Sequence, residues 1–347
     1  LVGSEMCIRD RWWTATARHA DIVFPITTVL ERNDLMMTKW EPMATPMHKA
    51  IEPVGESRND YDVFSGLAQR LGFFEEFTEG RNEEEWLRHL WDQARHRAGQ
   101  ANFELLDFDT FWQGGPKEIL KAEDKKILLE TFRKDPQNNP LSTPSGKVEI
   151  FSDVIAGFGY DDCPGHPVWM EPFEWLGGKT VKKFPLHIIS NQPSTRLHSQ
   201  LDSGSISKGS KIKDREPMTM NPVDAAGRGI KTGDVVRVFN ERGSCLAGVN
   251  LSENVMPGVI QLATGAWFDP IVPGQIGALC KHGNPNVLTM DRGTSSLAQG
   301  PTAHSTLVQV EKFNDDKIIT NMINSKNWVN NKYYGCLLYT SPSPRDK

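Results

Sequence analysis

The sequence predicts a region of mixed helices and strands followed by a β-rich domain of barrel type. In the first half, residues 57–72 and 82–96 have the apolar spacing of amphipathic helices. From residue 184 onward, short β-rich runs alternate with Gly and Pro turns, a pattern typical of closed all-β domains. The Gly- and Lys-rich residues 177–183 between the two regions indicate a linker. The expected fold class is therefore α/β plus β.

Length and composition describe an ordinary globular protein that is large enough for two domains. The chain has 347 residues, of which 38% are hydrophobic and 24% charged. A net charge of −5 argues against general binding to nucleic acid or to a membrane surface. No apolar run reaches the roughly 18 residues of a membrane-spanning helix, so we expect no membrane span.

The cysteines do not indicate a metal site. None of the five stands in a C-x-x-C pair or in a zinc or iron–sulfur spacing. Cys163 and His166 lie close together in the sequence, but one Cys and one His without further partners favour a structural role. We therefore expect free thiols and no metal ligand in this chain. The five cysteines are Cys7, Cys163, Cys245, Cys280 and Cys336.

Both ends of the chain look foreign to the rest. Residues 1–11 and 335–347 resemble translated sequencing-adaptor read-through, and we expect them to be artefacts without a part in the fold. The chain also begins without an initiator methionine or a signal segment. We therefore expect an internal or C-terminal piece of a longer protein.

The first half opens on a short expected strand at residues 22–24, which a proline ends. Glu31 and Asp34 follow, and we interpret them as members of a buried structural ion pair with Arg32 or a neighbour. Residues 36–50 contain four methionines and two prolines without a clear period. That pattern predicts irregular structure.

Two helices are then expected. Ser57 and Asp60 form a capping pair for the helix at residues 57–72, and Gly72 ends it. Its apolar face consists of Val63, Leu67 and Leu71.

Asn82 caps the second helix at residues 82–96, and three glutamates suit its positive N-terminal end. Residues 103–112 predict a further short helix and turn, residues 143–146 a turn, and residues 147–151 a strand. The apolar stripe of the second helix contains Trp86, Leu87, Leu90 and Trp91, which we expect to be core.

The second half predicts one short helix among strands. Asn221 caps the helix at residues 221–229, with Pro222 in its first turn and Gly229 beyond its end. A tight turn is expected at residues 230–234. The expected strands are residues 184–189, 235–239, 244–251, 259–263 and 306–310.

Three polar loops follow expected strands of this half. Residues 190–200, with the sequence SNQPSTRLHSQ, carry nine hydrogen-bonding side chains, and residues 264–267 and 283–299 are similar in kind. A strand that ends in such a loop is a common place for a polar ligand. The alternative is a solvated loop whose Ser and Asn side chains bond to their own backbone.

Several long blocks occur in an order that resembles one enzyme family. They include RLHSQ, the NP-x-DA-x-x-RGI-x-x-GD run, the GAW block and the GNPN-V-L-T-x-D-x-GTS-x-LAQ run. The first half adds WTATARHADIVFP-x-TT-x-LERND, TPSG-x-x-EIFS and CPGHP-x-W. Together they resemble the C-terminal part of the molybdopterin oxidoreductases of the dimethyl-sulfoxide reductase family. Within that family they are most similar to the trimethylamine-N-oxide and biotin sulfoxide reductases, over residues 12–314.

The resemblance implies a specific domain organisation. Residues 12–180 would be part of a discontinuous α/β domain whose other half lies upstream. Residues 183–313 would be a double-psi β-barrel that binds a molybdopterin dinucleotide. Residues 314–334 are polar and depart from the family pattern, so their status is left open.

The resemblance also implies a cofactor, molybdenum bis(molybdopterin guanine dinucleotide). Neutral amides and hydroxyls suit the alternating donors and acceptors of a pterin edge, and Arg196 could fork onto a pyrophosphate. Glycines at 265, 283 and 293 would let backbone N–H groups approach the ligand. The expected cofactor-binding residues are Arg196, His198, Ser199, Gln200, Gly265, Trp267, Asn286, Gln299, Thr14 and Thr16.

The implied activity is the two-electron removal of oxygen from trimethylamine N-oxide, dimethyl sulfoxide or biotin sulfoxide. A serine ligand to the metal would lie upstream, so we expect no catalytic residue here and no turnover by this chain alone. The expected electron donor is a partner such as a c-type cytochrome. The expected compartment is the periplasm, with the cytoplasm as the alternative. The other candidate functions are a nitrate- or formate-type molybdoenzyme fragment and a non-catalytic double-psi barrel that serves as a binding module.

Overall fold

The structure is a computed structural model with two compact units, one containing Ala20–Ser142 and the other Thr143–Tyr333. Each unit has its own hydrophobic core. The unit boundary lies upstream of the expected linker at residues 177–183, so the boundary between the two domains stays a prediction. Most of residues 314–334 and both expected artefact segments lie outside the described residues. The described residues are Ala17, Ala20, Ile318 and residues 22–37, 43–100, 102–118, 127–300 and 302–314.

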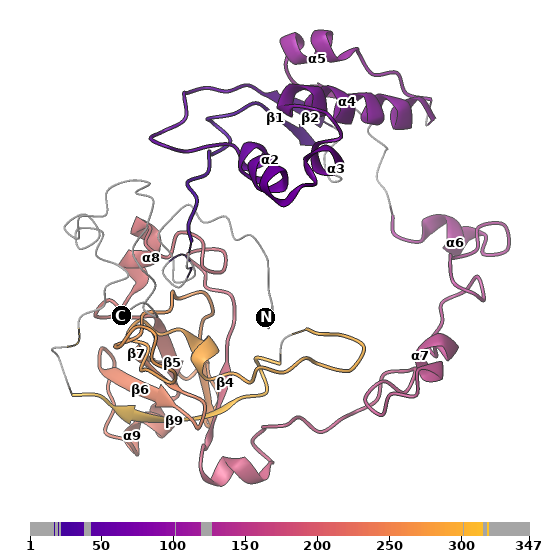
Figure 1. The fold of residues 1–347 in the computed structure, drawn as a ribbon. Helices are drawn as coiled ribbons and strands as arrows, with labels where there is room; N and C mark the ends of the chain where they lie inside the picture. The colour runs from indigo at the N-terminus through magenta and orange to yellow at the C-terminus, as the bar shows by residue number, and fades with distance from the viewer. Residues whose placement is uncertain are drawn as a thin grey trace. The chain divides into compact units, whose positions relative to one another are not determined.

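The first unit combines a small antiparallel sheet with several helices (Figure 1). Strand β2 pairs with β1 on one side and with β3 on the other. The strands are β1 (Asp34–Met37), β2 (Met43–Met47) and β3 (Lys117–Glu118), and the helices are α2 (Asp60–Leu71), α3 (Phe74–Thr78), α4 (Glu83–Gln100), α5 (Phe108–Gly114) and α6 (Glu130–Lys134).

Two predictions for the start of this unit are wrong. Residues 36–50 were expected to be irregular, but they contain part of β1 and all of β2. Methionine is unbranched and does not produce the alternating pattern by which strands are recognised in a sequence. The strand conformation here is stabilised by the pairing of β1 with β2. Conversely, residues 22–24 form no strand, and Ile26 makes only an isolated bridge to Arg58.

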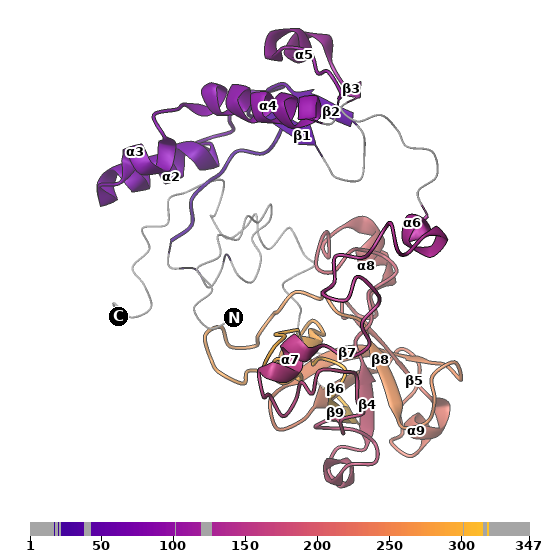
Figure 2. The same ribbon diagram turned by 90° about the vertical axis from the view of Figure 1, so that its right-hand side faces the viewer.

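Helix α4 carries the core of the first unit, as expected. Asn82 Oδ1 accepts a hydrogen bond from Glu85 N, and the Glu85 carboxylate accepts one from Asn82 N, which makes a reciprocal cap. The Trp91 ring stacks on Phe111 of α5 with 3.7 Å between ring centroids, and its Nε1 donates to Leu106 O. Figure 2 shows α4 as the long helix beside β1 and β2. Leu87 and Trp91 are buried, whereas Leu90 is 43% exposed.

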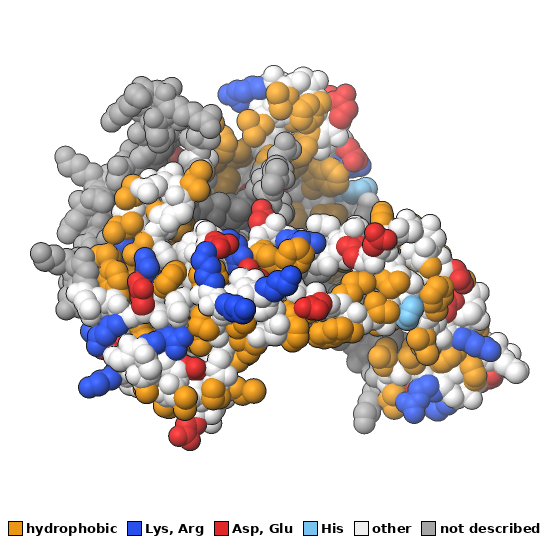
Figure 3. Space-filling model, turned by 90° about the horizontal axis from the view of Figure 1, so that it is seen from below, with side chains coloured by type: hydrophobic (Ala, Val, Ile, Leu, Met, Phe, Trp, Pro, Cys, Tyr) orange, Lys and Arg blue, Asp and Glu red, His pale blue; other side chains and the backbone are white. Residues whose placement is uncertain are grey.

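Helix α2 differs from its prediction at its start and on its apolar face. Asn59, rather than Ser57, is the N-cap, while Gly72 ends the helix with φ 85°, as expected. Leu67 and Leu71 are exposed, because no described element packs on that face. Figure 3 shows that exposed hydrophobic side chains are spread among charged ones on the face drawn there.

The start of the second unit is mostly irregular. Gly146 N donates to Thr143 O, which confirms the turn. Residues 147–151 form no strand, and Val148 and Ile150 are exposed; alternation alone does not supply a pairing partner. The segment contains the short helix α7 (Asp153–Gly157) and the 3-10 turn η1 (Lys179–Lys182).

Six strands then close into a barrel in the order β4-β8-β5-β7-β6-β9 (Figures 1 and 2). The pairs β4–β8 and β5–β7 are parallel, and the others are antiparallel. The strands are β4 (Leu186–Ile189), β5 (Pro217–Met220), β6 (Val235–Phe239), β7 (Ser244–Leu251), β8 (Val259–Leu262) and β9 (Leu307–Lys312). Between them lie α8 (Ser205–Ser210), α9 (Pro222–Ala226) and the 3-10 turn η2 (Pro285–Val287).

The barrel interior is filled by the alternating apolar side chains of these strands. Five of the six strands were expected from their apolar runs, two of them with the observed bounds. Strand β5 was missed because PMTM begins with proline and has no β-branched alternation. Cys245 and Cys280 are buried free thiols, and burial raises the pKa of Cys245. Asn221 caps α9 through Val223 N, with Pro222 at its start, as expected.

A partly buried ion pair fastens the irregular segment to the barrel. Glu174 meets both Nη atoms of Arg242 at 2.7 and 2.9 Å and accepts from Leu307 N at 2.8 Å. Burial would raise the pKa of Glu174, but the bonds from Arg242 and Leu307 N hold it below its ordinary value.

Glu174→Gln should lower the free energy of unfolding of the chain by about 1–3 kcal/mol at pH 7, because it weakens charged hydrogen bonds. A carboxylate with a lowered pKa stabilises the fold above its unfolded pKa of roughly 4.3 and loses that effect as pH falls. The difference between wild type and variant in urea unfolding should therefore shrink below about pH 4. A difference that is constant from pH 3 to pH 7 would contradict the assignment.

Candidate functional site

The site is built on the C-terminal ends of two neighbouring parallel strands. Strands β4 and β8 run in the same direction, with His187 opposite Val259 and Ile189 opposite Gln261. The loops that leave them therefore emerge at the same edge of the barrel. Thr264 N donates to Asn191 O at 2.9 Å, which joins the two loops where they begin.

The loop after β4 folds back on itself around His198. Gln192 Oε1 accepts from His198 N at 3.1 Å, and Gln192 Nε2 lies 2.7 Å from His198 Nδ1. His198 and Leu201 both have left-handed backbone angles, with φ 49° and 55°. Non-glycine residues adopt this conformation rarely, so surrounding contacts must hold the loop in place.

The loop after β8 supplies two of those contacts. Gly265 has φ 90°, and a Cβ placed on it would lie 2.0 Å from His198 O. Only glycine therefore permits this approach. Trp267 is 5% exposed and donates from Nε1 to Ser199 O at 2.8 Å. Both residues expected at the site in this loop thus shape the backbone of the loop after β4.

Arg196 has its guanidinium inside the protein, with 1% of its side chain exposed. It donates to His198 O and Thr264 O at 3.0 and 3.1 Å and pairs with Glu216 at 3.1 Å. These bonds occupy the atoms that would fork onto a pyrophosphate. In this structure Arg196 therefore joins the two loops, and its expected contact with a pyrophosphate stays a prediction.

A buried cluster of charged side chains lies beside Arg196. Lys211 bridges Asp202, at 2.7 Å, and Glu216. His282 Nε2 lies 2.8 Å from Asp202 Oδ2. Burial would raise the pKa of Asp202, but the hydrogen bond and charge of His282, with those of Lys211, hold it far below its ordinary value. Asp202 is therefore a carboxylate at neutral pH.

The third polar loop begins against this cluster. A Cβ on Gly283 would lie 2.8 Å from the Glu216 Cβ, so this glycine also permits a close approach. Asn286 is exposed, at the turn η2 that Asn284 caps. Gln299 is exposed as well, and its Nε2 donates a hydrogen bond within its own loop, to Ser295 O.

The residues expected at the site thus fall into two groups. His198, Ser199, Gln200, Asn286 and Gln299 carry exposed polar side chains. Arg196, Gly265 and Trp267 are turned into the protein and shape the loop after β4. Thr14 and Thr16 lie outside the described residues.

The donor set suits a pterin. Asn191 Oδ1 is buried, and no hydrogen-bond donor of the described residues reaches it. A buried acceptor that lacks a donor can accept a hydrogen bond from an N–H group of a ligand. The exposed side chains beside it are neutral amides and hydroxyls, with one imidazole, which match the mixed donors and acceptors of a pterin edge. The residues present therefore fit the implied cofactor.

Sequence reasoning missed the supporting residues. Asn191 and Gln192 lay in the expected loop but were not singled out. Asp202, Lys211 and His282 lie up to 80 positions apart in the chain, so no local pattern joins them. The one available signal was the charge of Asp202 directly after the loop.

The expected role of the charged run near residue 31 is partly confirmed. Arg32 pairs with Asp34 at 3.0 Å. Glu31 is buried but accepts from Thr28 N and Val54 N instead of pairing with Arg32. Those two backbone bonds lower the pKa of Glu31.

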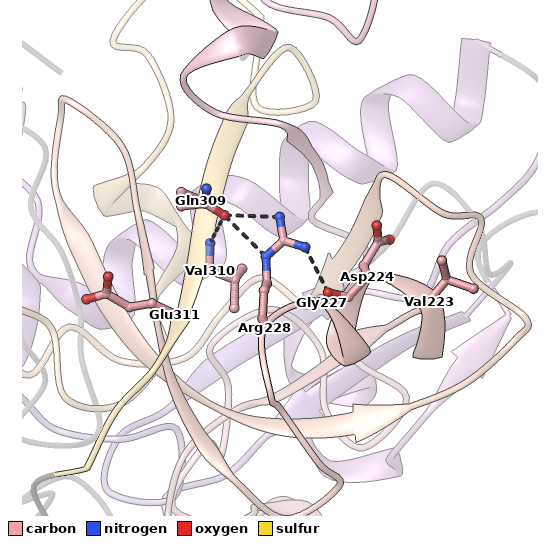
Figure 4. Close-up of a pocket in the computed structure, with 7 residues that line it drawn as sticks. All are labelled: Val223, Asp224, Gly227, Arg228, Gln309, Val310 and Glu311. Atoms are coloured by element: carbon pink, nitrogen blue, oxygen red, sulfur yellow. Dashed lines mark hydrogen bonds between the residues drawn. The ribbon is translucent and has the colours of Figure 1, made fainter.

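A shallow cavity of about 500 Å³ lies elsewhere on the barrel, beside α9 and β9 (Figure 4). Arg228 donates two hydrogen bonds to Gln309 Oε1, at 3.1 and 3.3 Å. Its guanidinium is therefore bonded to a neutral amide. None of the expected site residues lines this cavity. Its lining residues are Val223, Asp224, Gly227, Arg228, Gln309, Val310 and Glu311.

The described residues contain neither a cluster of metal ligands nor a helix suited to a membrane. In the described part of the chain, no three His, Cys, Asp or Glu side chains gather in a way that could hold a metal ion. Within the same residues, none of the helices combines the length and apolar character that crossing a bilayer requires.

Known families and proteins match most of the chain. The family Molydopterin dinucleotide binding domain matches residues 186–307, and the family Molybdopterin oxidoreductase matches residues 6–70. The chain is 47% identical over 309 residues to the dimethyl sulfoxide/trimethylamine N-oxide reductase of Cereibacter sphaeroides, covering 88% of this chain and 38% of that protein. It is 46% identical over 311 residues to trimethylamine-N-oxide reductase 1 of Escherichia coli (strain K12), covering 88% and 36%.

The chain thus spans less than two fifths of the length of these relatives. Among solved structures, acetylene hydratase from Pelobacter acetylenicus is similar, with a TM-score of 0.61 and 20% identity over 87% of this chain and 39% of that one. This likeness concerns the fold alone.

The matches and the closed six-stranded barrel confirm the expected fold class, an α/β region followed by a double-psi β-barrel. They also support a molybdenum–molybdopterin cofactor. The chain thus carries molybdopterin oxidoreductase domains: residues 6–70 match the Molybdopterin oxidoreductase family, and the barrel, over residues 186–307, matches the molybdopterin-dinucleotide-binding domain.

Proposed function

We propose that this chain is the C-terminal, cofactor-binding part of a molybdenum-dependent S-oxide or N-oxide reductase. The observation that carries the proposal is the pair of loops after β4 and β8, which bring neutral polar side chains to one edge of the dinucleotide-binding barrel. The relatives named above are reductases of dimethyl sulfoxide and trimethylamine N-oxide, which supports this substrate class.

The cofactor we propose is molybdenum bis(molybdopterin guanine dinucleotide). All five proposed ligand residues would bind it through exposed side chains. His198, Ser199 and Gln200 would do so from the loop after β4, and Asn286 and Gln299 from the third loop. Arg196, Gly265 and Trp267 would hold the loop after β4 in its binding conformation. When bound, the molybdenum group supplies two-electron oxygen-atom transfer, in which the oxide, two electrons and two protons give the reduced substrate and water.

The longer protein would take its electrons from a partner such as a c-type cytochrome and would work in the periplasm. The metal ligand would be a serine upstream of this chain, so this chain alone would not turn over. A nitrate- or formate-type enzyme is less well supported, because the relatives named above are oxide reductases. A non-catalytic binding module would not require the orphaned acceptor at Asn191.

The test is the substitution Asn286→Ala in the full-length protein. The Asn286 side chain is exposed, so its removal should leave the melting temperature unchanged while molybdenum per protein falls about tenfold, the value of one lost ligand hydrogen bond. Molybdenum would be measured by inductively coupled plasma mass spectrometry.

The matched control is Asn254→Ala, which removes an equally exposed amide from a turn away from the three loops. Equal molybdenum content in both variants would refute the assignment of the third loop. Assays with dimethyl sulfoxide, trimethylamine N-oxide and nitrate would then identify the substrate class.

A further inference from the structure

Asp202 is the centre of the buried cluster beneath the cofactor loops. Its carboxylate is 2% exposed and lies directly after the loop that follows β4. One carboxylate oxygen faces a lysine, a hydroxyl and a guanidinium, and the other faces a backbone N–H and an imidazole. The donors are Lys211 Nζ at 2.7 Å, Ser207 Oγ at 3.2 Å, Arg196 Nε at 3.4 Å, Trp267 N at 3.1 Å and His282 Nε2 at 2.8 Å.

These donors belong to separate segments of the second unit. Arg196 comes from the loop after β4, Trp267 from the loop after β8, and His282 from the segment before η2. A single carboxylate therefore joins all three polar loops at their bases. The hydrogen bond from Trp267 N to Asp202 is the most direct link between the loops after β8 and β4, because the Trp267 indole also donates to Ser199 O at 2.8 Å.

The hydrogen bonds also fix the position of the His282 ring. Its Nδ1 lies 3.0 Å from Asp214 O, and its Nε2 lies 2.8 Å from the Asp202 carboxylate. Each ring nitrogen therefore faces an oxygen acceptor inside the protein. The ring is completely buried, so no solvent molecule substitutes for either partner.

The cluster pairs two cations with two carboxylates, Arg196 and Lys211 with Asp202 and Glu216. The neighbouring Lys281 is paired with Asp269 at 3.3 Å. Removing one partner of a buried ion cluster leaves an uncompensated charge, which is costly. Loss of the Asp202 carboxylate should therefore disturb the loops whose side chains it pairs with.

We propose that Asp202 is a positioning residue of the cofactor site, which holds the loops after β4 and β8 together, with His282 as its hydrogen-bonded partner. This inference rests on the proposed function, because positioning matters only if these loops bind the cofactor. Asp202 itself is buried and does not reach the ligand side of the loops. It acts through the backbone of Trp267 and through Arg196.

The test is amide hydrogen exchange by NMR on the full chain without cofactor. In Asp202→Asn the side chain keeps its size but loses its charge, and its NH2 group opposes the N–H donors of Trp267 and His282. We expect the amides of Trp267 and Thr264 to exchange at least tenfold faster than in wild type. Val249, whose N–H bonds to Asp234 O in the barrel, should be unchanged. Glu174→Gln is the control, since it breaks an ion pair on the barrel without touching the two loops.

A second variant and a spectroscopic signal keep the test decisive. If Asp202→Asn unfolds the barrel, His282→Gln decides, because it removes the imidazole and leaves the carboxylate; the exchange of the same two amides should accelerate. The NMR signal of the His282 Nε2 proton, which faces the Asp202 carboxylate in wild type, should shift or disappear in Asp202→Asn.

Three results would overturn the inference. Acceleration of Trp267 alone would make Asp202 a local acceptor without a positioning role. An unchanged Thr264 amide in His282→Gln would remove His282 from the mechanism, as would an unchanged His282 Nε2 proton signal in Asp202→Asn. Because exchange is measured without cofactor, these results are independent of the molybdenum content that tests the proposed function.

Discussion

Gly265→Ala should empty the cofactor site and destabilise the chain by about 3 kcal/mol or more. A Cβ at this position would lie 2.0 Å from His198 O and 2.3 Å from His198 C, and both atoms belong to the backbone. Neither can rotate away, so the loops after β4 and β8 must separate. Separation breaks the bond from Trp267 to Ser199 O and exposes the base of the site. Urea unfolding of the chain and molybdenum content of the full-length protein would measure the two effects.

Gly233→Ala is the matched control. Gly233 has φ 86°, close to the 90° of Gly265, but a Cβ there would meet nothing within 4 Å. It should cost about 1 kcal/mol from backbone strain alone and leave molybdenum content unchanged. If both variants lose equal stability and both keep molybdenum, the close approach of the two loops has no part in cofactor binding.

Most strands of the barrel could be predicted because their apolar and β-branched residues indicate strand structure from the local sequence alone. Val235–Phe239 and Ser244–Leu251 are rich in β-branched or apolar residues and end at Gly-containing turns. The same signal failed at Met43–Met47 and Pro217–Met220, where methionine and proline take strand conformation only because a partner strand pairs with them. Residues 147–151 show the reverse, since alternation without a partner gave no strand.

The place of the candidate loops on the barrel could also be predicted, but not the direction of their side chains. Density of polar residues after a strand located the loops correctly on the barrel edge. It could not tell that Arg196 turns inward to His198 O and Thr264 O while Ser199 stays exposed. That choice depends on Glu216 and Lys211, which neutralise and surround the guanidinium from another part of the chain.

The two groups of residues explain how one edge of the barrel can be both polar and well ordered. Charged side chains are buried in the cluster, where they bond to backbone carbonyls and to one another. Neutral side chains are left to face the ligand. A substitution in the first group should therefore act on the loop conformation, and one in the second group on ligand contacts alone.

Substitutions of Arg196 separate an effect on loop conformation most clearly from an effect on ligand contacts. Arg196→Ala should destabilise the chain by about 3–5 kcal/mol, because it removes one partner of a buried ion cluster. Arg196→Lys keeps a positive charge near Glu216 but loses the planar fork that reaches His198 O and Thr264 O, and should cost only about 1–3 kcal/mol. Both variants should lose most of their molybdenum, since both release the loop after β4.

Amide exchange without cofactor identifies the cause of that loss. If Arg196 positions the loops, the Thr264 amide, which bonds to Asn191 O, should exchange faster in Arg196→Lys even when no cofactor is present. If Arg196 instead binds a pyrophosphate directly, molybdenum would fall while this amide kept its wild-type rate. Arg228→Lys is the control, because Arg228 also forks onto a protein acceptor but lies beside α9 and β9, where its loss should change neither quantity. The buried cluster around Asp202 and Glu216 leads us to expect the first result.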